Sequence, residues 1–309
     1  MTGAPSSDDD IDAMLGATIA KVGESAKVIA LRSEVDSLFA EARPVTPIVD
    51  PRSIPLRYSR LKAMAQSPAH YLLACQDDTR DTVAIRIGAG AHAGLFENRP
   101  VLCYPRRRQG KVWEAFEERC AEVRAVVLND REYEIARGII DSVRRHRRAH
   151  ELLFDGTVTE QTIAWMLAGR ACSSTPDAAS PRRQVELKST RCSDPVWFAR
   201  EAVRRYYHGQ MAFYDRALAT RGPRPDENFI VAVENVRPYN VTVMRLTDKA
   251  REVGDRLCQQ WIERVAAAES AGVYGGYVDR DVDLDALEHD EENYPEIPVE
   301  VDGKLLTIE

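Results

Sequence analysis

The sequence predicts an α/β fold in which a central β-sheet is flanked by helices, with a helical extension at the N-terminus. Polar and apolar residues alternate over residues 184–190, which is the period of a half-buried strand. Two apolar runs, residues 229–234 and 239–244, flank a turn around Pro238 and predict a hairpin. Residues 130–150 and 247–271 have the pattern and length of long helices. With 309 residues and 44% hydrophobic content, the chain can bury a full core.

The chain divides into three predicted parts. Residues 1–50 form an acidic helical extension and linker, because residues 11–40 carry helical apolar stripes and prolines from residue 44 onward forbid a continuous helix. Residues 51–275 form the main domain, and residues 276–309 an acidic C-terminal tail. Within that tail, residues 299–308 contain an Asp-Gly pair that predicts a small hairpin.

The main domain opens with short helices. Residues 58–65 predict the first, and Ser67 can cap a second that begins at Pro68. A capped helix start can receive a phosphate, although a simple helix corner explains the pattern equally well. Residues 86–97 are rich in small residues, which predicts a helix pressed against its neighbours with His92 on one face. A lone histidine of this kind is usually a core residue, and it becomes a metal ligand only if carboxylates converge on it.

Further elements follow in order. A basic loop at residues 106–111 precedes a helix around Trp113, and such a loop is either solvated or a phosphate contact. Residues 161–168 and 169–177 predict two strands, and Asp194 or Ser193 begins a helix that runs to Arg205. The next helical stretch places Gln210 and Tyr214 one turn apart on the same face.

Charge is distributed unevenly along the chain. The net charge is -7, but residues 279–309 carry -10 and residues 1–50 carry -5, which leaves +8 on residues 51–278. A basic body between acidic ends is typical of a polyanion-binding domain, and ordinary charge scatter with solvated tails is the alternative.

The six cysteines are dispersed and form no Cys-x-x-Cys motif, so we expect reduced thiols and no iron–sulfur cluster. The first residues lack the pattern of a signal peptide, and no run approaches the roughly 20 apolar residues of a membrane span. We therefore expect a cytoplasmic protein.

Residues 175–190 carry the chemistry. Alternation puts Val185 and Leu187 in the core and Glu186 and Lys188 together on the opposite face of the strand. The turn-forming residues 178–183 would return Asp177 to the same strand end. Two carboxylates can hold Mg²⁺, which lowers the pKa of an attacking water, and a lysine can stabilise developing negative charge. Taken alone, a Pro-Asp turn before a strand with solvated charges is also a common structural arrangement.

A set of motifs in this order resembles the RecE-like phage exodeoxyribonucleases of the PD-(D/E)xK superfamily. The set comprises Ser-Pro-Ala-His-Tyr at residues 67–71, Gly-x-x-x-His ending at His92, Gly-Lys at 110–111, Pro-Asp at 176–177, Glu-x-Lys at 186–188, Gln-x-x-x-Tyr at 210–214 and a late strand pair at 233–239. The resemblance runs from about Tyr58 to Ala271, and it implies a restriction-endonuclease-like core with a mixed sheet. Thr175 departs from it, since a basic residue usually precedes the Pro-Asp pair.

The resemblance also implies roles for individual residues. His92, Asp177 and Glu186 would bind Mg²⁺ or Mn²⁺, with the carbonyl of Leu187 as a further ligand. Lys188 would serve the attacking water, while Gln210 and Tyr214 would orient the site. The expected DNA contacts combine the basic loop with weaker candidates near the motifs: Ser67, Arg106, Arg107, Arg108, Lys111, Ser189, Thr190 and Arg191.

We therefore expect a Mg²⁺- or Mn²⁺-dependent exonuclease acting on double-stranded DNA ends in phage-type recombination. No Walker-type motif is present, so we expect no nucleotide motor. An endonuclease or nickase with the same site, and a non-catalytic DNA-binding or assembly protein with the same fold, are the alternatives. The expected partners are DNA, further copies of the chain in a homo-oligomer, and a single-strand annealing protein.

Overall fold

The computed structural model describes residues 49–277 apart from 77–80 and 98, together with two short strands, β10 (Val299–Val301) and β11 (Lys304–Leu306). These two strands pair in antiparallel fashion, which confirms the hairpin predicted around the Asp-Gly pair. The helix predicted at residues 11–40, most of the linker and most of the acidic tail lie outside the described residues. The domain boundaries at residues 50 and 275 therefore stay predictions.

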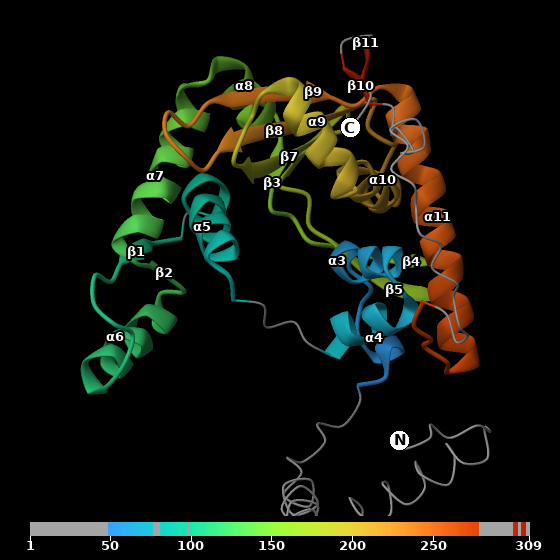
Figure 1. Cartoon of the computed structure of the whole chain (residues 1–309), viewed down its shortest axis with the longest axis horizontal. Coiled ribbons are helices and arrows are strands. Elements are labelled where there is room, and N and C mark those ends of the chain that lie inside the picture. Colours follow the sequence, from blue (N-terminus) through green and yellow to red (C-terminus); the bar gives the residue numbers. More distant parts are fainter. Residues whose placement is uncertain (1–48, 77–80, 98, 278–298, 302–303, 307–309) are drawn as a thin grey trace, which may run out of the picture. The chain divides into compact units, whose positions relative to one another are not determined.

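The centre of the fold is a five-stranded mixed sheet with the order β3-β6-β7-β8-β9 (Figure 1). β7 and β8 pair in parallel, and the other neighbouring pairs are antiparallel. The strand bounds are β3 (Val158–Thr159), β6 (Ala178–Ala179), β7 (Arg183–Thr190), β8 (Glu227–Glu234) and β9 (Val241–Arg245). The predicted α/β class with a mixed central sheet is confirmed, and so is the hairpin that joins β8 to β9.

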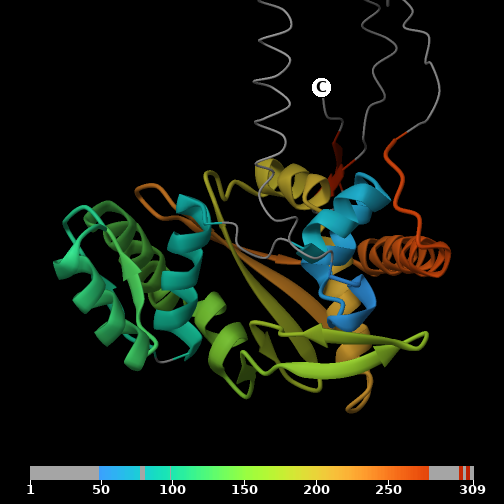
Figure 2. The ribbon, with the colours of Figure 1, turned by 90° about the horizontal axis from the view of Figure 1, so that it is seen from below.

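Helices cover both faces of this sheet, because β8 and β9 carry apolar residues on each face that pack against helices. In Figures 1 and 2, α5, α6 and α7 gather on one side, and α3, α4, α10 and α11 on the other. The bounds of the helices on the first side are α5 (Val83–His92), α6 (Lys111–Glu122), α7 (Asp130–Arg145) and α8 (Arg147–Phe154). The remaining helices are α3 (Tyr58–Leu61), α4 (Pro68–Gln76), α9 (Pro195–Arg204), α10 (Tyr207–Leu218) and α11 (Asp248–Ala271).

β7 separates the core from the polar face as its alternation predicted. Val185 and Leu187 are buried in a cluster with apolar residues of α5, α7 and α8. On the opposite face, Phe198 of α9 and Met211 of α10 pack against Ile230 of β8. The parallel connection from β7 to β8 runs through α9 and α10, so α10 is held against the face of the sheet that carries Glu186.

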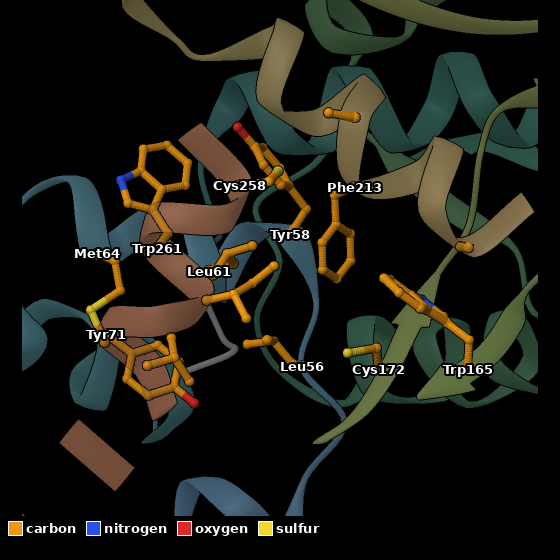
Figure 3. Close-up of a cluster of buried hydrophobic side chains, with 14 of the residues drawn as sticks. Leu56, Tyr58, Leu61, Met64, Tyr71, Trp165, Cys172, Phe213, Cys258 and Trp261 are labelled. Atoms are coloured by element: carbon orange, nitrogen blue, oxygen red, sulfur yellow. The ribbon is translucent and has the colours of Figure 1, made fainter. Parts of the chain in front are cut away.

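A second core joins the N-terminal helices to α10 and α11 (Figure 3). The ring of Tyr58 lies at a tilt against those of Phe213 and Trp261, with centroids 6.1 and 6.3 Å away, and Trp165 packs edge-on against Phe213 at 5.1 Å. Leu56 forms a β-bridge with Cys172 and attaches the segment before α3 to β5 (Arg170–Ser174). This core ties residues 56–71 to the helix that carries Gln210 and Tyr214.

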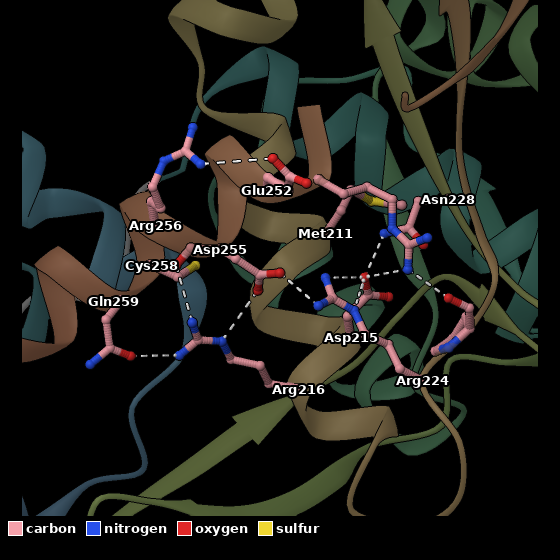
Figure 4. Close-up of polar contacts among 12 residues, drawn as sticks. Met211, Asp215, Arg216, Arg224, Asn228, Glu252, Asp255, Arg256, Cys258 and Gln259 are labelled. Atoms are coloured by element: carbon pink, nitrogen blue, oxygen red, sulfur yellow. Dashed lines mark hydrogen bonds and ion pairs between the residues drawn. The ribbon is translucent and has the colours of Figure 1, made fainter. Parts of the chain in front are cut away.

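An ion-pair network also fixes α10 against its surroundings (Figure 4). Asp215, with no exposed surface, accepts hydrogen bonds from Arg224 and Asn228, and Arg224 reaches on to Asp255 of α11. Arg216, the residue that follows Asp215 on α10, also contacts Asp255. Polar contacts to Asn228 of β8 and, through Arg224, to α11 therefore hold α10 in place.

Two sequence predictions need correction. The single helix predicted from residue 130 to 150 is divided at His146, which adopts an extended backbone and accepts a hydrogen bond from the Ala149 amide, so that it caps α8. The strands predicted at 161–168 and 169–177 exist as β4 (Ile163–Leu167) and β5 (Arg170–Ser174), but they form a separate hairpin, and residues 175–177 lie beyond it.

The small residues of the predicted helix at 86–97 do allow close packing. α5 ends at His92 and continues as a π-helical turn, Ala93–Glu97. A Cβ atom on Gly94 would lie 2.5 Å from the terminal methyl of Ile140 on α7, so the absence of a side chain leaves room for this close approach. All six cysteines are free, as predicted. Among the helices that the structure describes, none combines the length and apolarity needed to cross a membrane.

Candidate active site

The predicted acids and lysine meet where β6 begins, beside the middle of β7. Asp177 lies immediately before β6, and its Oδ2 accepts a hydrogen bond of 2.7 Å from the Leu187 amide. The amide of Asp177 in turn donates to Oε1 of Glu186 at 3.1 Å. The Pro-Asp turn therefore lies beside the strand that carries Glu-x-Lys. The backbone amide of Leu187 holds the Asp177 carboxylate, and the backbone amide of Asp177 holds the Glu186 carboxylate.

Glu186 is the centre of a hydrogen-bond network. It is 1% exposed, and its Oε2 accepts hydrogen bonds from Lys188 Nζ at 2.8 Å and from Gln210 Nε2 at 3.0 Å. Gln210 lies 3.2 Å from the hydroxyl of Tyr214, so the pair predicted on one face of a helix is in contact. α10 thus places both side chains beside the acidic cluster in the middle of β7.

The charges of these groups depend on one another. Burial, assisted by the charge of Asp177, raises the pKa of Glu186 to about 7. Burial alone would lower the pKa of Lys188, but the carboxylates of Glu186 and Asp177 outweigh it and raise that pKa above its ordinary value. Lys188 is therefore an ammonium group at neutral pH, which makes it a hydrogen-bond donor and not a general base.

His92 reaches the same cluster from α5. Its Nδ1 lies 2.9 Å from Oε1 of Glu160 and 3.7 Å from Oδ1 of Asp177. Burial would lower the pKa of His92, but the two carboxylates outweigh this effect and raise it to about 9. An imidazole borne by a helix and an aspartate 85 positions later in the chain are thus neighbours in space.

Glu160 is the residue of this cluster that sequence reasoning missed. It follows the two-residue strand β3, and nothing in its neighbourhood resembles a motif. Its proximity to Asp177 comes from the pairing of β3 with β6, which is a long-range contact without a local signal.

The donor set fits a divalent cation. Within the residues that the structure describes, His92, Glu160 and Asp177 form a group whose ligand atoms all lie within 4.8 Å of one another. A cation with ligands at about 2.1 Å spans about 4.2 Å between opposite ligands, so small side-chain rotations would close the group around one ion. Carboxylate oxygens favour a hard ion such as Mg²⁺ or Mn²⁺.

A polar pocket opens beside these residues. It has a volume of about 460 Å³, and Glu160, Gln210 and Tyr214 line it together with Arg57 and Lys62 from the start of the domain. Tyr207 also lines it, and the ring of this tyrosine lies 5.3 Å from Nζ of Lys188. A charged or polar ligand that entered the pocket would therefore reach the carboxylate cluster.

The predicted DNA contacts have different surroundings. Arg106, Arg107 and Lys111 are exposed, whereas Arg108 donates to the Val127 carbonyl and lies over the ring of Trp113. Arg191 is exposed and Ser189 half-buried directly after the Glu-x-Lys motif.

Two of the predicted contacts are buried. The hydroxyl of Ser67 lies 2.7 Å from Nδ1 of His70, and that of Thr190 donates to Glu201 at 2.6 Å. Both hydroxyls therefore have partners inside the protein. The roles of all these residues in DNA binding stay predictions.

A mixed sheet that brings a Pro-Asp turn and a Glu-x-Lys strand into one buried cluster defines the PD-(D/E)xK nuclease class. The chain belongs to a family of this class: residues 58–277 match the model of the PDDEXK-like domain of unknown function (DUF3799). This match covers nearly the same residues as the resemblance drawn from the motifs. It confirms the predicted superfamily, while membership of the RecE-like group stays a prediction.

One solved structure agrees at the level of the fold. A "putative exonuclease" from Eubacterium rectale has a TM-score of 0.55 and 13% identity, over 78% of this chain and 96% of its own. An alkaline exonuclease from Laribacter hongkongensis, LHK-Exo, has 15% identity over 61% of this chain and 93% of its own, with a TM-score of only 0.27. A search of curated proteins finds no relative that matches this chain.

Proposed function

We propose that this chain is a divalent-metal-dependent deoxyribonuclease, and that it acts as an ATP-independent exonuclease on double-stranded DNA ends. The observation that carries the proposal is the meeting of His92, Asp177, Glu186 and Lys188 from three separate segments in one cluster beside the middle of β7. Such a cluster of charges is costly to bury, and it is explained by phosphodiester chemistry.

His92, Asp177 and Glu186 would hold the cation, with the Leu187 carbonyl as a further ligand. A bound divalent cation offsets charge on the phosphate and lowers the pKa of an attacking water. Lys188 keeps its proton and donates to that water or to the developing negative charge. Gln210 and Tyr214 hold Glu186 in place, because the Gln210 amide donates to both.

Several features support nucleic acid as the substrate. Arg57 and Lys62 line the pocket beside the carboxylates, and residues 51–278 carry a net charge of +8. Cationic side chains near a phosphodiester site attract and position the DNA backbone. The exposed Arg106, Arg107 and Lys111 would extend this contact away from the site.

The choice of an exonuclease over an endonuclease rests on the resemblance to RecE-like enzymes, as do the role in phage-type recombination, the homo-oligomer and the annealing partner. Two similar solved structures carry exonuclease names, at identities that speak for the fold alone.

The test is a cleavage assay without ATP on linear duplex DNA and on covalently closed circles, in Mg²⁺, in Mn²⁺ and in EDTA. We expect loss of the linear duplex with either cation, intact circles, and no cleavage in EDTA. Lys188→Ala should abolish cleavage, while Lys249→Ala, which changes an exposed lysine at the start of α11, should leave the rate unchanged.

Each other outcome has a clear meaning. Cleavage of closed circles would replace the exonuclease by an endonuclease or nickase. DNA binding without cleavage in either metal would indicate a non-catalytic DNA-binding or assembly protein. Full activity in Lys188→Ala would remove the proposed mechanism, and light scattering that gives a monomer would remove the expected oligomer.

A further inference from the structure

Glu160 is aligned with the acids of the site by strand register. Thr159 of β3 pairs with Ala178 of β6, and Ala178 pairs with Val185 of β7. One step along the same rows places Glu160, Asp177 and Glu186 side by side across three strands. The Glu160 amide donates to the Asp177 carbonyl at 3.1 Å, which extends the ladder to this row.

A row of three acids is unfavourable by itself. Like charges that are directly opposite each other on neighbouring strands destabilise a sheet. Lys188 contacts Glu186 at the β7 end of the row, whereas Glu160 at the β3 end faces the imidazole of His92. At the β3 end the His92 ring already lies beside both carboxylates, and a divalent cation bound between Glu160 and Asp177 would offset their charges in its place.

The backbone at Glu160 is held in an uncommon conformation. Its φ angle is +50°, in the left-handed region that non-glycine residues seldom adopt. This conformation ends β3 and accompanies a side chain that is 22% exposed and lines the polar pocket beside the site. The carboxylate thus faces both His92 and the space from which a substrate would approach.

We propose that Glu160 is a further ligand of the catalytic cation, bound together with His92 and Asp177. The inference rests on the proposed metal-dependent function, and it adds to that site a residue that the motifs did not identify. The ligand atoms of His92, Glu160 and Asp177 all lie within 4.8 Å of one another, so a cation bound between them would replace the direct contact between Glu160 and the imidazole.

The first test measures binding of Mn²⁺ alone by isothermal titration calorimetry, without DNA. Glu160→Gln keeps the shape of the side chain and removes its charge, and it should weaken Mn²⁺ binding about tenfold or more. Glu118→Gln removes one charge from an exposed position on α6 and should change the affinity less than twofold, which separates ligation from net charge. Equal affinities in Glu160→Gln and the wild-type chain would overturn the inference.

The second test is a crystal structure of the wild-type chain with Mn²⁺, located by its anomalous scattering. A carboxylate oxygen of Glu160 should lie within bonding distance of the ion, at about 2.2 Å. An ion bound by Asp177 and Glu186, with Glu160 bonded only to the His92 ring, would overturn ligation by Glu160.

These results are independent of cleavage. If Mn²⁺ binds through Glu160 but no DNA is cleaved, the inference holds and the proposed function fails. If DNA is cleaved and Glu160→Gln binds Mn²⁺ as tightly as the wild-type chain, the function holds and the inference fails.

Discussion

Gln210 on α10 donates from Nε2 to Oε2 of Glu186 on β7 at 3.0 Å. This bond joins the helix layer to the strand that carries Glu-x-Lys. It shares the acceptor atom with Lys188, whose Nζ lies 2.8 Å away. The position of the Glu186 carboxylate therefore depends on how α10 packs against β7.

Replacing Gln210 by Ala should lower the nuclease rate about 10- to 100-fold, the usual effect of removing a group that orients a metal ligand. Glu186 would keep its bond to Lys188 but could rotate away from the site. The measurement is the initial rate of cleavage of a linear duplex in Mg²⁺, with thermal melting to confirm folding. Gln260→Ala, on the exposed surface of α11, is the control and should retain the wild-type rate. A Gln210→Ala enzyme with the wild-type rate would show that the bond has no catalytic role.

The ring of Tyr207 should help to hold the ammonium group of Lys188 in position, with a smaller effect on the cleavage rate than that of Gln210. Its centroid lies 5.3 Å from Nζ, a distance at which an aromatic face attracts a cation. Tyr207→Leu should reduce the cleavage rate about two- to fivefold, because that is the range of a partly exposed contact of this kind. Tyr207→Phe keeps the ring and should stay near the wild-type rate. Equal losses in both variants would assign the effect to the hydroxyl instead.

Gly254 of α11 lies against the backbone of α10. A Cβ at this position would lie 2.3 Å from the carbonyl oxygen of His208, so the helices could not keep their present distance. Gly254→Ala should therefore destabilise the protein by about 1–3 kcal/mol. Gly88→Ala is the matched control in a helix, because an added Cβ there meets nothing within 4 Å, and it should stabilise by about 0.5–1 kcal/mol. Urea unfolding measures both, and similar effects of the two changes would contradict the packing argument.

Asp215 should be among the costliest polar residues to remove. It is fully buried and accepts hydrogen bonds from Arg224 and Asn228, so Asp215→Ala would leave a partly buried guanidinium without this partner (Figure 4). We expect a loss of about 3 kcal/mol in the free energy of unfolding. Glu252→Ala breaks an exposed ion pair with Arg256 in the same view and should cost less than about 1 kcal/mol. Chemical denaturation would test this, and a loss below 1 kcal/mol in Asp215→Ala would refute it.

Local periodicity was enough to predict the parts of the site that lie within one element. The alternation around Glu186 and Lys188 fixes their common face, and helical spacing fixes the contact of Gln210 with Tyr214. The turn-forming residues 178–183 predicted that Asp177 lies beside the strand that carries Glu186, and the contact between Asp177 and Leu187 confirms it. Each of these relationships is written in a few neighbouring residues.

Contacts between segments that are distant in the sequence were harder to predict from local patterns. Glu160 enters the cluster only through the pairing of β3 with β6, and a two-residue strand has no recognisable period. The break at His146 depends on a side chain that caps the following helix, which competes with an apolar pattern that continues across it. A histidine on a helix of small residues has no distinguishing pattern of its own. His92 could therefore be proposed as a ligand only from the Gly-x-x-x-His motif of the resemblance.

The two faces of β7 impose a limit on how this gene can change. Val185 and Leu187 pack in the core, while Glu186 and Lys188 contact each other in the candidate site. Core residues and site residues therefore alternate along this strand. An in-frame insertion of a single codon early in this strand would turn the charged pair inward and the aliphatic pair outward. An insertion or deletion within residues 183–190 would thus abolish both folding and activity. The same change in an exposed loop would leave the register of β7, and with it both properties, intact.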